Sequence, residues 1–164
     1  MKAMVLILMG SDSDVSVMEG ASAVLEEFNI PYKMTVSSAH RTPDRTLKLI
    51  QSSEKEGIRV IIAGAGAAAH LAGVVASHTT LPVIGVPIDS SPLNGIDALY
   101  STVQMPPGIP VATMAVGKGG AKNAGIFAAQ ILGLTDTRLA NALKEYRKKM
   151  AAEVVRKAKK VEMK

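Results

Sequence analysis

Short apolar runs alternate along the chain with longer stretches that have one apolar face. The runs at residues 5–9, 60–63 and 82–86 are almost continuously apolar, which is typical of strands buried on both faces. Two further strands are predicted over residues 31–36 and 111–116. This alternation predicts an α/β fold, with a parallel sheet that carries helices on both faces and is joined by right-handed crossovers.

Helical periodicity fills the segments between these strands. In the first segment the apolar positions recur at a helical spacing, namely Val17, Ala21, Val24, Leu25 and Phe28. Further helices are predicted over residues 43–56, 70–77, 96–104 and 121–132. Gly57 is expected to end the helix at 43–56, and residues 117–120 are expected to form a turn.

From Asp136 onward the pattern predicts one long amphipathic helix. Its apolar stripe contains Leu139, Leu143, Tyr146, Met150 and Val154. At ~1.5 Å per residue such a helix would extend beyond a small domain. Its stripe therefore needs cover, and a neighbouring subunit would supply it, although an ordinary core within one chain is the alternative. We expect residues 1–164 to form a single α/β domain, with 1–134 as its body and 135–164 as a helix that packs on a neighbouring subunit.

Charge and composition restrict the class of protein. The net charge is +5, but ten of the 19 basic side chains lie between Arg138 and Lys164, beside three acidic ones. The basic excess therefore belongs to one helix face, and no aromatic residues interleave with it to bind nucleic acid. The absence of Cys excludes disulfide and thiol chemistry. No apolar run approaches the ~20 residues of a membrane span, and we interpret the first residues as a strand, not as a signal peptide. We expect a cytoplasmic protein.

Candidate chemistry gathers where the second predicted strand gives way to a helix. The segment reads Ser38, Ala39, His40, Arg41, Thr42 and Pro43. In open α/β sheets ligands bind at the carboxyl ends of the strands. Histidine can transfer a proton near neutral pH, and arginine fits a phosphate or carboxylate. Thr42 before Pro43 predicts a helix N-cap, which would fix the direction of His40. The alternative is that His40 and Arg41 are plain surface residues.

The first predicted strand ends in a comparable segment, Gly10 to Asp14. Backbone N–H groups and the hydroxyls of Ser11 and Ser13 could hold a phosphate there, and Asp14 could accept hydrogen bonds from a ribose. The alternative is that Ser13 or Asp14 only caps the following helix. The two interpretations are compatible, because one turn can serve both purposes.

A rival interpretation comes from residues 64–69, which match the G-x-G-x-x-A pattern of dinucleotide-binding proteins. Asp89 follows about 20 residues later, as the ribose-binding acid would. Against this, the pattern lies in the third strand–helix unit and not in the first. A tight turn that lets the backbone approach a ligand is the structural alternative.

Two other patterns give little support for a functional site. His70 and His78 lie near the two ends of a predicted alanine-rich helix, but no Cys or acidic residue lies between them, so we expect no metal site. The segment from Lys118 to Lys122 lacks the spacing of a phosphate-binding Walker loop.

Five segments together resemble a known family. In order they are residues 10–14 (GSDSD), 38–44 (SAHRTPD), 63–71 (AGAGAAAHL), 81–87 (LPVIGVP) and 104–106 (QMP). They resemble, in the same order, the N5-carboxyaminoimidazole ribonucleotide mutases. These purine-biosynthesis enzymes are also called the catalytic subunit of phosphoribosylaminoimidazole carboxylase. The resemblance covers about residues 5–132.

The resemblance implies a flavodoxin-like three-layer α/β/α sandwich, assembled as a homo-octamer, with the C-terminal helix on a neighbour. It implies a carboxylated aminoimidazole ribonucleotide as substrate and no metal, nucleotide or organic cofactor. His40 would be the general acid and base, and Asp14 would hold the ribose. The other implied substrate-binding residues are Ser11, Ser13 and Arg41 at the phosphate, Ser38 and Ala39 beside them, and Gly66, Ala67, Ala68, His70 and Leu71 around a carbon dioxide pocket.

The resemblance leaves details open. Arg41 after His40 favours the mutase class over the directly carboxylating class, which usually has a lysine there. Ala67, Ala72 and Val74 replace the customary glycine, proline and methionine, and each replacement is expected to change the shape of the carbon dioxide loop. Direct carboxylation of aminoimidazole ribonucleotide and a dinucleotide-binding module remain the alternatives.

Overall fold

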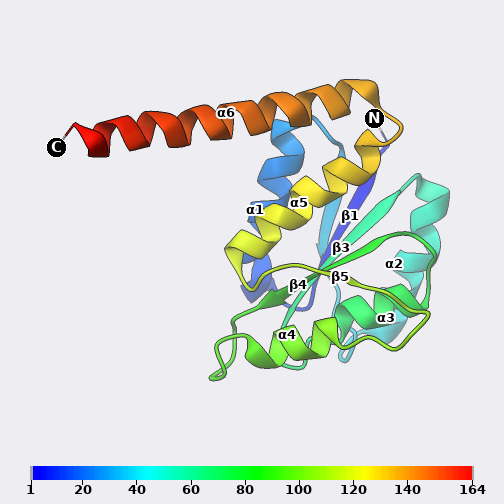
Figure 1. Cartoon of the computed structure of the whole chain (residues 1–164). Coiled ribbons are helices and arrows are strands. Elements are labelled where there is room, and N and C mark those ends of the chain that lie inside the picture. The colour runs from blue at the N-terminus through cyan, green and yellow to red at the C-terminus, as the bar shows by residue number, and fades with distance from the viewer. Residues whose placement is uncertain (1, 164) are drawn as a thin grey trace.

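The computed structural model describes residues 2–163. Its centre is a five-stranded parallel sheet with the strand order β2-β1-β3-β4-β5 (Figure 1). The strands are β1 (Val5–Met9), β2 (Tyr32–Val36), β3 (Val60–Gly66), β4 (Val83–Ile88) and β5 (Ala112–Thr113). This is the strand order of the flavodoxin-like folds.

Helices cover both faces of the sheet, which confirms the predicted three-layer sandwich (Figure 1). The first five are α1 (Val15–Glu27), α2 (Pro43–Glu56), α3 (Leu71–Ser77), α4 (Ile96–Val103) and α5 (Lys118–Gly133). Helices α1 and α5 pack against each other on one face, and α2 and α3 lie on the other. A short 3₁₀ turn, η1 (Asp12–Asp14), precedes α1.

The central strands are buried on both faces because their side chains alternate between the two helical layers. In β1, Val5, Ile7 and Met9 pack with α1 and α5, whereas Leu6 and Leu8 pack with α2 and α3. All five side chains are buried. A continuous apolar run, not an alternating one, is therefore what this position in the fold requires.

Helix α2 follows the sequence pattern closely. It begins at Pro43 and ends at Glu56, as predicted. Gly57 then adopts a left-handed conformation with φ of 95°, which glycine tolerates without steric cost and which ends the helix.

Several element boundaries differ from the sequence prediction: β4 ends at Ile88 and not at residue 86, and three other elements differ more. Strand β3 continues to Gly66, because residues 61–66 pair with β4 along their whole length. Strand β5 is only two residues long, because it lies at the sheet edge and pairs only with Ile84 and Gly85. Helix α5 begins at Lys118, so residues predicted as a turn form its first turn, after Gly117 at φ 77°.

Helix α6 (Thr137–Glu162) is the predicted long C-terminal helix. Asp136 caps it by accepting a hydrogen bond from the Leu139 N–H group at 3.1 Å. Its first half packs within the chain, where Leu139 is buried and the rings of Tyr146 and Phe28 lie 5.5 Å apart. Its second half projects from the body (Figure 1) and leaves Met150 51% and Val154 67% exposed. Within residues 2–163, no helix combines the length and apolar character needed to cross a membrane.

Close packing of α1 and α5 depends on Gly125. A Cβ there would lie 2.7 Å from the Ala21 carbonyl oxygen and 2.9 Å from Val24 Cβ. We expect Gly125→Ala to lower the free energy of unfolding by about 1–3 kcal/mol through overpacking. Gly119→Ala, in the same helix, meets no atom within 4 Å and should raise it by up to ~1 kcal/mol. Urea unfolding measures both, and equal stability of the two variants would contradict this packing.

Candidate active site

A pocket of about 270 Å³ lies at the carboxyl ends of four neighbouring strands. Gly10 and Ser11 follow β1, Ser38 follows β2, Gly66 ends β3, and Ser90 follows β4. Because the strands are parallel and adjacent, loops that are distant in sequence converge at one edge of the sheet.

The pocket brings together nearly all the residues that the sequence singled out. Its lining includes Ser11, Ser13, Asp14, Ser38, Ala39, His40, Arg41, Gly66, Ala68, His70 and Leu71. Ala67 is not part of the lining, because it turns the chain with a φ of 50° beside the pocket. His78 ends α3 outside the pocket and is exposed.

Sequence reasoning did not name Ser90 and included Gly10 and Ala65 only as members of the segments 10–14 and 64–69, although all three line the pocket. Ser90 lies two residues beyond the end of β4, so the strand-end rule could have found it. A side chain at position 66 would collide with the Ser90 hydroxyl. Glycine at 66 therefore makes the room that Ser90 occupies at the rim.

The loop after β1 is organised by a capping box. The Asp14 carboxylate accepts a hydrogen bond from the Ser11 N–H group at 3.0 Å, and the Ser11 hydroxyl accepts one from the Ser13 N–H group at 3.4 Å. Ser11 is thus the cap of η1, whereas Asp14 has the N-cap position of α1, one of the two positions that the sequence offered. The Asp14 side chain makes no capping hydrogen bond to α1, because its carboxylate is used in the capping box of η1, which precedes α1.

Asp14 is the buried acid of this loop, at 4% exposure. Burial raises the pKa of its carboxyl above the usual 3.8, against the opposing effects of hydrogen bonds from Ser11 and Ser13 and the charge of Arg41. The carboxylate is therefore held in place by donors while it is poorly solvated, which suits a group that accepts further hydrogen bonds from a ligand.

Arg41 links the first two loops. Its Nη2 atom donates to the Gly10 carbonyl oxygen at 2.7 Å, and its Nε atom donates to the Ser38 hydroxyl at 3.4 Å. The guanidinium is thereby directed across the pocket toward the β1 loop. It has five N–H donors in a planar fork, so donors remain for an anion.

Thr42 has the predicted N-cap position, but its side chain does not cap α2. Its hydroxyl accepts from the Ser38 N–H group and donates to the Ser38 carbonyl oxygen, both at 3.0 Å. The bonds close a five-residue loop around His40. The predicted consequence, a fixed direction for this loop, arises from that closure and not from a cap.

The imidazoles of His40 and His70 are hydrogen-bonded to each other. The distance from His40 Nε2 to His70 Nδ1 is 2.9 Å, and the ring planes are nearly perpendicular at 86°. A hydrogen bond between two such nitrogens needs a proton on one and a lone pair on the other. The tautomers of the two rings are therefore coupled.

The dinucleotide-binding interpretation does not agree with the structure. Gly64 and Gly66 lie inside β3, opposite Val86 and Ile88 of β4, and not in a strand-to-helix turn. Gly64 is needed because Met18 of α1 fills the space that its side chain would take. Asp89 does not line the pocket. Residues 2–163 also contain no group of three His, Cys, Asp or Glu side chains placed to hold a metal ion.

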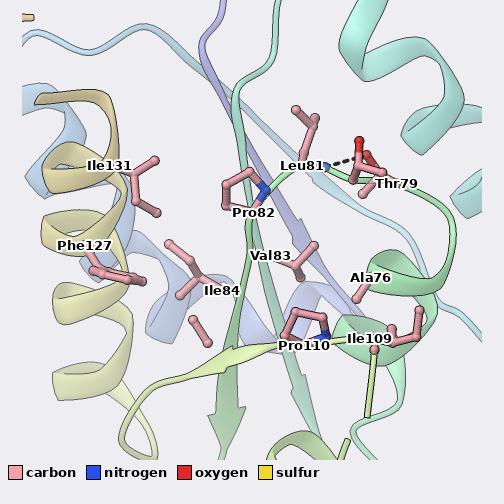
Figure 2. A pocket seen from close by; sticks show the side chains of 13 residues that line it. Ala76, Thr79, Leu81, Pro82, Val83, Ile84, Ile109, Pro110, Phe127 and Ile131 are labelled. Carbon is pink, nitrogen blue, oxygen red and sulfur yellow. Dashed lines mark hydrogen bonds between the residues drawn. The ribbon is translucent and has the colours of Figure 1, made fainter. Parts of the chain in front are cut away.

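A second, larger pocket of about 430 Å³ lies between the start of β4 and α5 (Figure 2). Ile84 points toward Phe127 and Ile131, whereas Val83, the preceding residue of β4, points to the other face of the sheet, toward Ala76 (Figure 2). None of its lining residues is ionisable. This pocket therefore offers no acid–base group, whereas the pocket at the strand ends contains His40 and His70.

The fold and the pocket define a flavodoxin-like α/β protein with a polar pocket at its strand ends. A family model described as AIR carboxylase matches residues 4–153. The chain belongs to this family.

Similar proteins agree with this assignment. The chain is 57% identical to the N5-carboxyaminoimidazole ribonucleotide mutase of Thermotoga maritima, with 95% of this chain and 90% of that protein covered. It is 51% identical to the mutase of the same name from Escherichia coli, with 93% and 90% covered. The crystal structure of Treponema denticola PurE is similar, with a TM-score of 0.87 at 31% identity, and covers 96% of this chain and 98% of that one. The resemblance inferred from five short segments is thus confirmed.

Burial of Asp14 predicts a pH-dependent stability difference. At neutral pH the folded protein carries a charge that burial disfavours, and acid removes that penalty as the carboxyl becomes protonated. We therefore expect Asp14→Asn to gain stability relative to the parent at about pH 7, with the gain shrinking toward about pH 3.5. Urea unfolding at both pH values measures this, with Asp12→Asn as the control in the same loop. A difference that does not change with pH would contradict the assignment.

Proposed function

We propose that the protein interconverts N5-carboxyaminoimidazole ribonucleotide and 4-carboxy-5-aminoimidazole ribonucleotide, a step of purine biosynthesis. The observation that carries this proposal is the pocket itself, which combines His40, the Arg41 guanidinium and the Ser11–Asp14 loop. Relatives that carry the mutase name are 51–57% identical over most of the chain. The reaction would take place in the cytoplasm.

The substrate phosphate would bind where the first two loops meet. The hydroxyls of Ser11 and Ser13 and the N–H groups of η1 offer donors, and Arg41 offers charge. The Asp14 carboxylate would accept hydrogen bonds from the ribose. Binding these remote groups orients the imidazole ring, which is how binding energy lowers the barrier of the chemical step.

The imidazole ring would then lie against His40 and residues 66–71. In the first step the carbon–nitrogen bond of the carbamate breaks, carbon dioxide is released into the pocket, and the nitrogen receives a proton from His40. In the second step the ring carbon attacks carbon dioxide, and His40 recovers a proton from that carbon. The net change moves one carboxylate and one proton, so no outside reagent is needed. Gly66, Ala68 and Leu71 would confine the carbon dioxide between the two steps.

Direct carboxylation is the second candidate. A Schizosaccharomyces pombe protein named phosphoribosylaminoimidazole carboxylase is 51% identical over 95% of this chain, which corresponds to 28% of that longer protein. The two reactions separate when labelled bicarbonate is present during turnover. A mutase keeps the carboxyl carbon of its substrate, whereas a direct carboxylase incorporates the label into product from aminoimidazole ribonucleotide.

Replacement of His40 tests its role in proton transfer. We expect His40→Asn to lower kcat by roughly 10²–10⁴, the range for one acid–base group, while substrate affinity stays close to normal. Turnover of synthetic substrate followed by NMR, together with isothermal titration, measures both quantities. Retention of most activity would remove His40 from the chemical step.

Arg41→Ala is the matched replacement in the binding half of the site. It removes the charge from the phosphate region but leaves the imidazole pair in place. We expect the free energy of substrate binding to weaken by about 1.5–3 kcal/mol, the value of a hydrogen bond to a charged group, with a smaller effect on kcat. Unchanged affinity in the same titration would place the phosphate elsewhere.

We also propose a homo-octamer in which the outer half of α6 packs on a neighbouring copy. Met150, Val154 and Val155 are exposed apolar side chains on this half, and residues 2–163 leave more than half of each uncovered. Charged side chains introduced at these apolar positions should therefore dissociate the assembly. The body should stay folded, because the inner half of α6 holds the helix on the body.

The double variant Met150→Glu, Val154→Glu is expected to lower the mass measured by sedimentation velocity without changing the circular dichroism spectrum. Lys159→Glu, an exposed charge on the same helix, is the control and should keep the parent mass. An unchanged mass for the double variant would show that this half of α6 makes no essential subunit contact.

A further inference from the structure

The segment that carries His70 is held in a tight and strained turn. Ala67 has a φ of 50°, a left-handed conformation that costs energy for any residue with a Cβ. The Ala69 N–H group donates to the Ala67 carbonyl oxygen at 2.9 Å, and the His70 N–H group donates to that of Ala68 at 2.8 Å. Each bond spans only two residues, so the turn needs support from outside.

Ser101 of α4 supplies that support, although it does not line the pocket. The Ala69 N–H group, which already donates to the Ala67 carbonyl oxygen, also donates to the Ser101 hydroxyl oxygen at 3.0 Å. The Ser101 hydroxyl in turn donates a hydrogen bond to the Asp97 carbonyl oxygen at 2.7 Å, within α4. Ala69 is 1% exposed, so water does not replace this acceptor.

Within residues 2–163, Ser101 is the one side chain that hydrogen-bonds the backbone of residues 67–70 from another element. Ala69 immediately precedes His70, whose ring meets His40 at 2.9 Å. A continuous chain of contacts therefore runs from α4 through the buried Ala69 N–H group to the imidazole pair.

We propose that Ser101 is a positioning residue for the reaction, because it holds His70 where its Nδ1 atom can keep His40 in one tautomer. This inference rests on the proposed function for its kinetic consequence but not for its structural one. Without the Ser101 acceptor the turn relaxes, His70 moves from His40, and the His40 ring interconverts between tautomers. Proton transfer then loses its alignment while the phosphate and ribose contacts remain.

The test compares Ser101→Ala with Ser101→Thr, which retains the hydroxyl. We expect Ser101→Ala to lower kcat by about ten- to a hundredfold, as a small misplacement of a catalytic group does, with KM within about twofold of the parent. Ser101→Thr should recover most of kcat. Ser77→Ala removes a hydroxyl with the same kind of bond, to the Val74 carbonyl oxygen, but it has no contact with the turn, and should act like the parent.

A second readout does not depend on activity. The chain has three histidines, so long-range ¹H–¹⁵N spectra resolve each imidazole, with His78 as the internal reference. In the parent and Ser101→Thr we expect one donor and one acceptor nitrogen for His40. In Ser101→Ala its nitrogen shifts should move toward an average of both tautomers while those of His78 stay fixed.

The two readouts separate the possible failures. An inactive parent with the expected spectra would overturn the proposed function but leave the positioning role. Unchanged nitrogen chemical shifts of His40 in Ser101→Ala would overturn the positioning role. A rise in KM with kcat unchanged would overturn it as well. If Ser101→Ala does not fold, Ser101→Cys keeps the size with a weaker acceptor, and parent-like kcat and spectra in that variant would also contradict the proposal.

Discussion

The parallel register of β1, β2, β3 and β4 is the constraint on which the site depends. Met9 lies opposite Val36 on one side and Gly64 on the other, and Gly64 in turn lies opposite Val86. The strands therefore end close together at one edge, and the loops that follow them form one pocket. A slip of one residue would turn every side chain of β1 to the wrong helical layer, so the core that buries β1 also sets the position of the site.

Within this frame, short polar contacts hold the loops in one arrangement. The capping box fixes the loop after β1, the Thr42–Ser38 bonds close the loop after β2, and Arg41 connects the two. The imidazole contact joins the second loop to the third. Each contact satisfies polar groups that would otherwise need water, so the pocket is arranged before a substrate arrives, which lowers the cost of orienting it.

Much of this was predictable from the sequence, because local rules and the strand-end rule agree. The apolar run at Val5–Met9, the bounds of α2 and the stop at Gly57 follow from patterning and turn chemistry. The convergence of the Ser11 and His40 segments follows from parallel strands alone. In these regions each local preference supports the global fold.

The differences arise where distant parts of the chain decide the local structure. Gly64 lowers strand propensity, yet it lies inside β3 because Met18 from α1 requires its missing side chain. The contact between His40 and His70 joins residues 30 positions apart, and no local pattern signals it. Ser101 acts from still farther along the chain. These are tertiary effects, which composition and periodicity do not encode.

A crystal structure with bound 4-carboxy-5-aminoimidazole ribonucleotide would test the central claim most directly. We expect the phosphate against Ser11, Ser13 and Arg41, with the imidazole ring within hydrogen-bonding distance of His40. A ligand that occupies the larger pocket between the start of β4 and α5, or that directs its carboxylate away from His40, would contradict the account.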